Sequence, residues 1–150
     1  MIKLIASQGV IKDTKLNYET LGNICTQIFR SGFGKDLKLK CIIHKSRTAD
    51  LSCIEKISRG KYKISLDTKG DTDKKYYIGT ILHELRHAIQ DEIFKFRVIA
   101  KFSTYNAYYN SLEEKDARKQ ERLTTEVMKI YDNYEKAQEK FVKFNLKELG

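Results

Sequence analysis

The sequence has no proline, no tryptophan and no long apolar run. No apolar stretch approaches the roughly 18 residues that a membrane-spanning helix needs, so we expect no such helix. The apolar part of the opening residues 1–8 is too short for a secretory signal, so we expect the protein in the cytoplasm of a cell or of an infected host. Cysteines are few and odd in number: Cys25, Cys41 and Cys53 lack C-x-x-C spacing, and we expect buried, reduced thiols.

Length and composition indicate one compact domain. The chain has 150 residues, of which 41% are hydrophobic and 11% aromatic, and this composition argues against intrinsic disorder. We expect residues 1–118 to form the main body of the domain and residues 119–150 a helical extension of it.

One short motif carries most of the chemical information. Residues 83–87 read H-E-x-x-H, and they include two of the chain's three histidines. On a helix, His83 and His87 leave the same face one turn apart, where both imidazoles can bind one zinc ion. Glu84 beside them can accept a proton from zinc-bound water, whose pKa the metal brings near neutrality. Apolar residues at helical spacing should bury this helix and place the histidines at the edge of a core; they are Tyr77, Ile78, Ile81, Leu82, Leu85 and Ile89.

A catalytic zinc usually has three protein ligands and a water, so a third ligand must come from elsewhere. Ser111 and Glu114 fit a capping box, which predicts a new helix whose first turn faces the site. Without the upstream motif, an acidic helix start favoured by the macrodipole would be the simpler interpretation. With the motif, we expect Glu113 or Glu114 to be the third ligand.

Two segments resemble a known family. Residues 83–90 (HELRHAIQ) and 114–118 (EKDAR) resemble small zinc-peptidase-like domains of the gluzincin type, found in bacterial and phage proteins. The resemblance implies Zn²⁺ ligation by His83, His87 and Glu114, with Glu84 as general base and Asp116 supporting the ligands. A proline often precedes the ligand glutamate in such domains, and this chain has none. The resemblance identifies no residue that would stabilise an oxyanion.

The fold class expected is α+β and zincin-like, with a small, mainly antiparallel sheet packed on the motif helix and a long C-terminal helix after it. A short strand is expected at residues 2–5. Alternating apolar residues predict further strands at 37–43, 51–57 and 62–66, with a turn at 58–61 between the last two. By the resemblance, residues Tyr62 to Leu66 form the sheet edge along which an extended peptide would pair.

Helix boundaries are predicted from capping residues. Asp13 or Thr14 can begin a helix that Gly32 and Gly34 end. Residues 71–73 (DTD) can begin the motif helix, whose pattern runs to about residue 102. Residues 103–110 then connect the two ligand-bearing helices, and their tyrosines Tyr105, Tyr108 and Tyr109 can pack over the site.

The C-terminal third contains apolar residues that alternate by four and three, with no proline or glycine between them. They are Leu123, Val127, Ile130, Tyr134, Ala137, Phe141 and Phe144. A single helix from residue 111 to 148 would be longer than a domain of this size is wide. Either a break folds its second half back, or the helix binds a second copy or another protein.

Positive charge is concentrated upstream of the motif. Residues 1–75 contain 16 basic and 8 acidic residues, a net charge of +8, whereas residues 76–150 contain 13 and 12, a net charge of +1. The lysines form no block and accompany no recognised nucleic-acid-binding motif, so nucleic acid is a less favoured partner than a peptide or protein substrate. Two functions remain: a zinc-dependent peptidase, or a non-catalytic module of the same fold, of phage origin in one interpretation, that uses its basic face and long helix for contacts.

Overall fold

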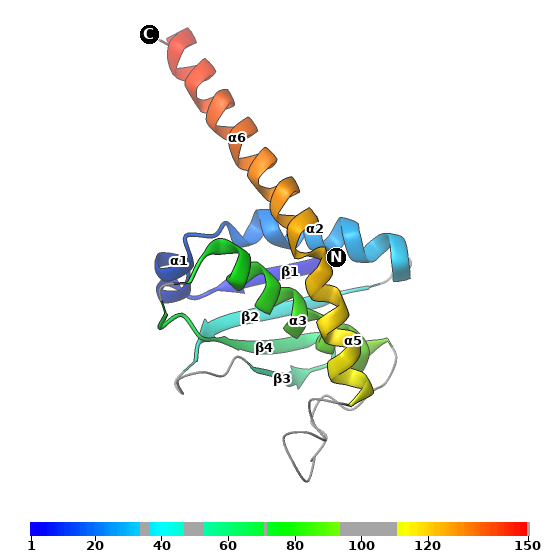
Figure 1. Cartoon of the computed structure of the whole chain (residues 1–150). Helices are drawn as coiled ribbons and strands as arrows, with labels where there is room; N and C mark the ends of the chain where they lie inside the picture. Colours follow the sequence, from blue (N-terminus) through cyan, green and yellow to red (C-terminus); the bar gives the residue numbers. More distant parts are fainter. Residues whose placement is uncertain (34–36, 47–52, 71, 94–110, 150) are drawn as a thin grey trace.

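The fold is α+β, with helices packed on a four-stranded sheet and a long helix at the C-terminal end (Figure 1). The structure is a computed structural model that describes residues 1–33, 37–46, 53–70, 72–93 and 111–149. The sheet order is β1-β2-β4-β3, formed by β1 (Ile2–Ala6), β2 (Leu39–Lys45), β3 (Cys53–Ser58) and β4 (Lys61–Leu66). The expected α+β class and long C-terminal helix are confirmed.

The sheet is mixed and mostly parallel, which corrects the expectation of a mainly antiparallel sheet. β1 pairs with β2, and β2 with β4, in parallel; only β3 and β4 are antiparallel. The turn between β3 and β4 makes the predicted hairpin, but β4 then lies between β3 and β2 and runs in the direction of β2. A hairpin is encoded by adjacent residues, whereas this insertion depends on segments distant in the sequence, so the alternating pattern did not reveal it.

The strand expected at the sheet edge is internal, and this prediction is wrong. Residues Tyr62 to Leu66 belong to β4, which pairs on both sides, and among the described strands the edges are β1 and β3. The hairpin that places β4 requires a glycine at its turn. Gly60 has a φ of +71°, and a Cβ there would lie 3.0 Å from the carbonyl oxygen of Lys38.

Two helices follow β1, and their caps differ from the expected ones. Ser7 caps α1 (Gln8–Thr14) through its hydroxyl, which accepts the Val10 amide hydrogen. Asp13 and Thr14 are not caps, because both lie in the last turn of α1. The side chain of Asn17 instead accepts the amide hydrogen of Thr20 at 3.0 Å, in the first turn of α2 (Tyr18–Phe33).

Helix α2 closes the outer edge of β1. A Cβ at Gly22 would lie 3.2 Å from the carbonyl oxygen of Ile2, so glycine permits this close approach. The Thr26 hydroxyl accepts the Ile2 amide hydrogen at 2.8 Å, which satisfies an edge group that would otherwise need water. The helix continues through Gly32, which the sequence suggested as a stop, and Gly34 lies outside the described residues.

Helix α3 (Lys74–Glu92) carries the H-E-x-x-H motif across one face of the sheet (Figure 1). Asp73 caps it, because its side chain accepts the Tyr76 amide hydrogen at 3.0 Å, and this confirms the predicted entry. The predicted apolar stripe is buried throughout, with exposures of 0–3% at Tyr77, Ile78, Ile81, Leu82, Leu85 and Ile89. The part of the predicted pattern that reaches residue 102, and the three tyrosines of the connecting segment, lie outside the described residues.

The C-terminal region is not one helix. A 3-10 turn, η1 (Glu121–Leu123), separates α5 (Leu112–Gln120) from α6 (Thr124–Leu149). The 26 residues of α6 span about 39 Å, and its C-terminal part extends away from the sheet (Figure 1). No helix among the described residues combines the length and hydrophobicity needed to cross a bilayer.

The face of α6 that packs on the domain differs from the predicted seam. Val127 and Tyr131 are buried at 0% and 1%, whereas the seam positions Ile130 and Tyr134 are 47% and 50% exposed. The Tyr131 hydroxyl also accepts the Asn17 amide hydrogen at 2.8 Å. With Thr124, which is 4% exposed, the described buried residues of α6 all lie near its start, so the packed face is short and leaves the predicted seam after Val127.

The cysteines behave as expected at two of three positions. Cys25 and Cys41 are buried in the core, and burial raises the pKa of each thiol to about 12, so both are protonated and unreactive. Cys53 is exposed, contrary to expectation, because β3 lies at the edge of the sheet.

Candidate metal centre

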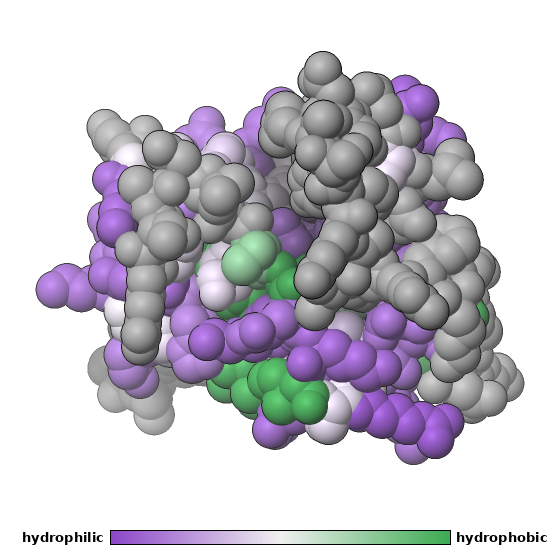
Figure 2. Space-filling model, turned by 90° about the horizontal axis from the view of Figure 1, so that it is seen from below, coloured by the Kyte–Doolittle hydropathy of each residue, from purple (hydrophilic) through white to green (hydrophobic). Residues whose placement is uncertain are grey.

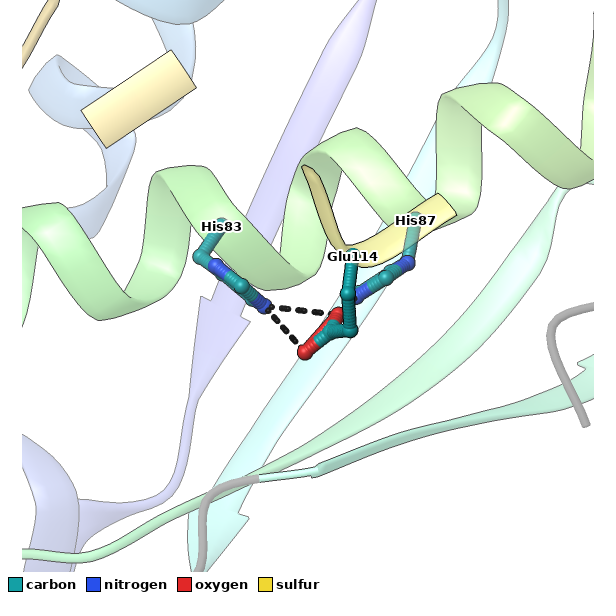
Figure 3. Close-up of side chains that lie close together, drawn as sticks. All are labelled: His83, His87 and Glu114. Atoms are coloured by element: carbon teal, nitrogen blue, oxygen red, sulfur yellow. Dashed lines mark hydrogen bonds and ion pairs between the residues drawn. The ribbon is translucent and has the colours of Figure 1, made fainter. Parts of the chain in front are cut away.

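Three predicted ligands converge from two helices. Figure 3 shows His83 and His87 extending from α3 toward Glu114 of α5. The Nε2 atom of His83 lies 3.2 Å from each carboxylate oxygen of Glu114, and that of His87 lies 2.6 Å from Oε2. One ligand atom from each residue can be chosen so that all lie within 4.8 Å of one another. These three side chains can therefore bind one metal ion.

The geometry suits a small cation. Nitrogen and oxygen ligands of tetrahedral zinc lie about 2.0–2.2 Å from the metal, and hence about 3.3–3.6 Å from one another. The 3.2 Å separations at His83 are close to this range. The shorter contact at His87 is a hydrogen bond, and a metal that replaces its proton would lengthen it by less than about 1 Å. The two rings, with centroids 5.0 Å apart and planes at 73°, are already turned toward the same carboxylate.

A hydrogen-bonded chain lies behind His87. The His87 Nδ1 atom is 2.9 Å from Gln90 Oε1, and the Gln90 amide nitrogen donates to Asp116 Oδ2 at 2.7 Å. Arg86 donates to the same carboxylate from Nε at 2.7 Å and from its terminal nitrogen at 3.3 Å. These hydrogen bonds therefore connect α3 to the first turns of α5, next to the three predicted ligands.

This chain determines which ring nitrogen of His87 faces the metal site. An ionised Asp116 accepts hydrogen bonds only, so Gln90 must present its amide nitrogen to Asp116 and its oxygen to His87. The Nδ1 atom of His87 must then be the donor, so the Nε2 lone pair is the one available to a metal that replaces the Nε2 proton. Metal-bound histidines usually have their second nitrogen held in this way.

The carboxyl groups of Glu114 and Asp116 are ionised, as binding of a cation requires. Burial alone would raise the pKa of Glu114, but hydrogen bonds from His83 and His87 outweigh it and lower that pKa well below the ordinary value. Asp116 shows the same balance, because hydrogen bonds from Arg86 and Gln90 outweigh burial and lower its pKa. Both carboxylates are therefore ionised at neutral pH.

Glu84 lies buried beside the ligands, at 6% exposure. Burial raises the pKa of its carboxyl to about 7, although the neighbouring His83 and His87 lower it and Glu114 raises it further. A bound divalent cation would act as an additional positive charge and lower this pKa. A carboxyl in this range can both accept and release a proton near neutral pH.

Glu114 is the glutamate that the structure brings to the two histidines. The Ser111 hydroxyl accepts the Glu114 amide hydrogen at 3.2 Å, which is one half of the predicted capping box. The Glu114 carboxylate is used by the histidines instead of returning to the cap. The Glu113 side chain lies outside the described residues, so its competition for the metal is not tested.

Sequence reasoning named Asp116 but gave no role to Gln90. A signal was available, because Gln90 is three residues after His87 and four after Arg86, which places all three on neighbouring positions of one helical face. The sequence could not predict that Asp116, 26 residues further along, accepts the hydrogen bond that orients Gln90.

Comparisons with models of protein families, with curated proteins and with solved structures gave no match to this chain. The site is therefore characterised by its own geometry.

Proposed function

We propose that this protein is a zinc-dependent metallopeptidase that hydrolyses peptide bonds in a peptide or protein substrate. The observation that carries the proposal is the convergence of His83, His87 and Glu114 with a buried carboxyl, Glu84, adjacent to the first histidine. Two histidines and a glutamate are a ligand set used by catalytic zinc sites, which keep a fourth position for water.

Each residue then has a distinct task. Bound zinc would polarise the substrate carbonyl and lower the pKa of its water. His83, His87 and Glu114 hold the cation, and the chain from Gln90 to Arg86 keeps His87 in the required tautomer. Glu84 accepts the proton of the attacking water and passes it to the leaving amine.

A structural metal site would not need such a base. A structural zinc site is normally closed by four protein ligands. Among the described residues, His83, His87 and Glu114 are the group of histidine, cysteine and acidic residues that meets the geometry of a metal site, which favours a site with an open position.

The edge strand offers a place for an extended substrate. Among the described strands, β3 pairs on one side only, so its other side can add a peptide strand through main-chain hydrogen bonds. Lys56 of β3 contacts Asp91 at 2.9 Å, and Asp91 lies one helical turn after His87. This ion pair fixes β3 against the helix that carries the ligands.

Elemental analysis combined with a cleavage assay tests the proposal. The parent should contain one zinc per chain and cleave a denatured, fluorescently labelled protein. Glu84→Gln should retain zinc and lose cleavage by at least about 100-fold, because only the base is removed. Glu114→Ala should lose both, and Glu126→Gln, at an exposed position on α6, should change neither.

Two results would contradict the peptidase. If Glu84→Gln cleaved as fast as the parent, the assigned base would be wrong. If the parent bound zinc and cleaved no protein or peptide substrate, the non-catalytic binding module would be the better description.

A further inference from the structure

Three lysines that are far apart in the sequence form a row across the sheet. Lys3 is the register partner of Lys40, and Lys40 is the register partner of Lys61, so the three side chains leave the same face. Their neighbours along each strand point into the core and are almost fully buried: Ile2, Leu4, Leu39, Cys41 and Tyr62. The lysine row (Lys3, Lys40 and Lys61) therefore lies on the face of the sheet opposite to the core.

This face is open to solvent. Lys3 and Lys40 are exposed and Lys61 is half-buried, and none of the other described residues that point this way is buried. They are Ile5, Ile42, His44, Cys53, Glu55, Lys63 and Ser65. Parallel sheets normally have both faces covered, so an open face on a mostly parallel sheet is a feature that needs a cause.

The lysine row has no compensating acid in the described part of the chain. Glu55, the acidic residue on this face, lies 3.8 Å from Lys63 and not in ion-pair contact with the row. Adjacent strands are only about 4.8 Å apart, so like charges on register partners repel one another. Two further basic residues stand at the same end of the strands: exposed Lys38, two residues before Lys40, and exposed Arg59 in the turn beside Gly60.

We propose that this open face binds the phosphate backbone of duplex nucleic acid through the lysine row. Repeated, closely spaced cations match repeated phosphates, and they release counterions when they bind. The described residues that point outward include no phenylalanine, tyrosine or tryptophan, whereas binding of single strands relies on such rings for base stacking. The ligand fitted by this face is therefore a duplex, contacted by its backbone and without base recognition.

Few large apolar side chains point outward from this face; among its described residues they are Ile5 and Ile42. The described surface seen from below, on the β3 side of the sheet, is also mainly hydrophilic, with small hydrophobic patches (Figure 2). Large contiguous apolar patches are what a stable protein interface would use.

The row is independent of the metal centre. Helix α3, which carries His83 and His87, packs on the core side of the sheet, so the two surfaces face in opposite directions (Figure 1). Duplex binding should therefore survive removal of the metal by a chelator. If the protein bound no duplex, the proposed peptidase activity would be unaffected. If it cleaved no peptide, the proposed duplex binding would likewise be unaffected.

Fluorescence anisotropy with the full chain tests this proposal. Labelled 20-base-pair DNA and RNA duplexes are titrated at several salt concentrations in the presence of chelator. The parent should bind at low salt, and Lys3→Gln/Lys40→Gln/Lys61→Gln should bind at least about tenfold more weakly. The slope of log affinity against log salt should fall by about 2–3, since each phosphate contact contributes about 0.9. The DNA and RNA arms show which duplex is preferred.

Two matched variants separate the row from general charge. Lys75→Gln/Lys129→Gln/Lys136→Gln removes the same charge from exposed positions on α3 and α6 and should change affinity less than threefold. Lys3→Arg/Lys40→Arg/Lys61→Arg keeps the charge and should bind as the parent does. Circular dichroism melting checks that each variant is folded.

Three outcomes would overturn the proposal. In the first, the two triple glutamine variants lose the same amount of duplex affinity relative to the parent, which would indicate diffuse attraction. The parent could fail to bind either duplex at low salt. Finally, labelled polyglutamate could bind in preference to both duplexes, which would make an acidic protein the partner.

Discussion

Gln90 is the residue on which the orientation of His87 depends. It accepts from His87 Nδ1 and donates to Asp116, and it is 1% exposed. It touches no metal in this arrangement, yet it selects the tautomer that can bind one. Its effect on the metal is therefore exerted through His87 alone.

We expect Gln90→Ala to weaken zinc binding by about 10- to 100-fold without removing a ligand. The reason is that His87 loses the acceptor that keeps Nδ1 protonated. Competition with a fluorescent zinc chelator measures this affinity. Gln27→Ala, at an exposed position on α2, is the control, and equal affinities in the two variants would contradict the assigned role.

The ion pair between Arg86 and Asp116 predicts a pH dependence of stability. The folded-state pKa of Asp116 is lowered, because hydrogen bonds from Arg86 and Gln90 outweigh burial. A group with a lowered folded-state pKa stabilises the protein above its unfolded pKa, about 3.9, and loses this contribution as the pH falls through the folded value.

Metal-free Asp116→Asn should therefore be less stable than the metal-free parent at pH 7 by about 1 kcal/mol, a value reduced for partial solvent screening. The difference should shrink as the pH is lowered from 4 toward 2. Urea unfolding at several pH values measures it. A constant difference at all pH values would show that Asp116 stabilises the fold by packing rather than by its charge.

At the scale of elements, the C-terminal end of α3 is fastened to the β3–β4 hairpin. The Tyr62 hydroxyl lies 2.5 Å from an Asp91 carboxylate oxygen and 2.8 Å from one of Glu92, which share its single hydrogen, and Glu92 also accepts the Gly60 amide hydrogen at 2.8 Å. Burial, followed by these two carboxylates, raises the pKa of Tyr62 strongly, so the hydroxyl remains a donor. The fastening holds the helix that carries both histidines against the sheet.

Tyr62→Phe should lower the free energy of unfolding by about 1–2 kcal/mol, because the two carboxylates lose a buried donor. Chemical denaturation provides the measurement. Tyr134→Phe, where the side chain is 50% exposed, should change stability by less than about 0.5 kcal/mol. If the two variants were equally stable, the hydroxyl would not be fastening the elements.

The sequence predicted local features of these elements well. The alternation of β2 and β4, the helix entry at residues 71–73 and the stripe on α3 were all correct, because each depends on residues a few positions apart. The position of His83 and His87 on one face of the helix could be predicted for the same reason. Zinc as the metal and Glu84 as base stay predictions.

Features that depend on distant segments were not predicted. The parallel pairing of β2 with β4 joins residues about 20 positions apart, and nothing in either strand encodes its partner. A break in the C-terminal helix was one of two alternatives, but its position at η1 could not be predicted, because residues 121–123 contain no proline or glycine to signal it. The hydrogen bond from Gln90 to Asp116 depends in the same way on how α3 and α5 pack.

At the scale of the whole molecule, the described contacts between α6 and the body of the protein come from the first half of the helix. Lys74 contacts Asp132 at 2.9 Å and Glu135 at 3.4 Å, and its ammonium lies 5.1 Å from the Tyr131 ring centroid. Residues 137–140 are exposed. The role of this helix in self-association or in binding a partner stays a prediction.

A chain that stops after Lys136 should fold and bind zinc as the parent does. It keeps Val127, Tyr131 and the contacts of Lys74, so its melting temperature should change by no more than about 2 °C. Light scattering on the same pair tests self-association, with a higher mass for the parent if the removed segment mediates it. A large drop in melting temperature would show that the distal half packs on the domain.

The central claim is that His83, His87 and Glu114 bind one cation together. Zinc X-ray absorption spectroscopy on the loaded protein tests it most directly. We predict one zinc per chain with two imidazole nitrogens and carboxylate oxygen at about 2.0–2.2 Å. A spectrum with sulfur at about 2.3 Å, or with no imidazole contribution, would contradict the account.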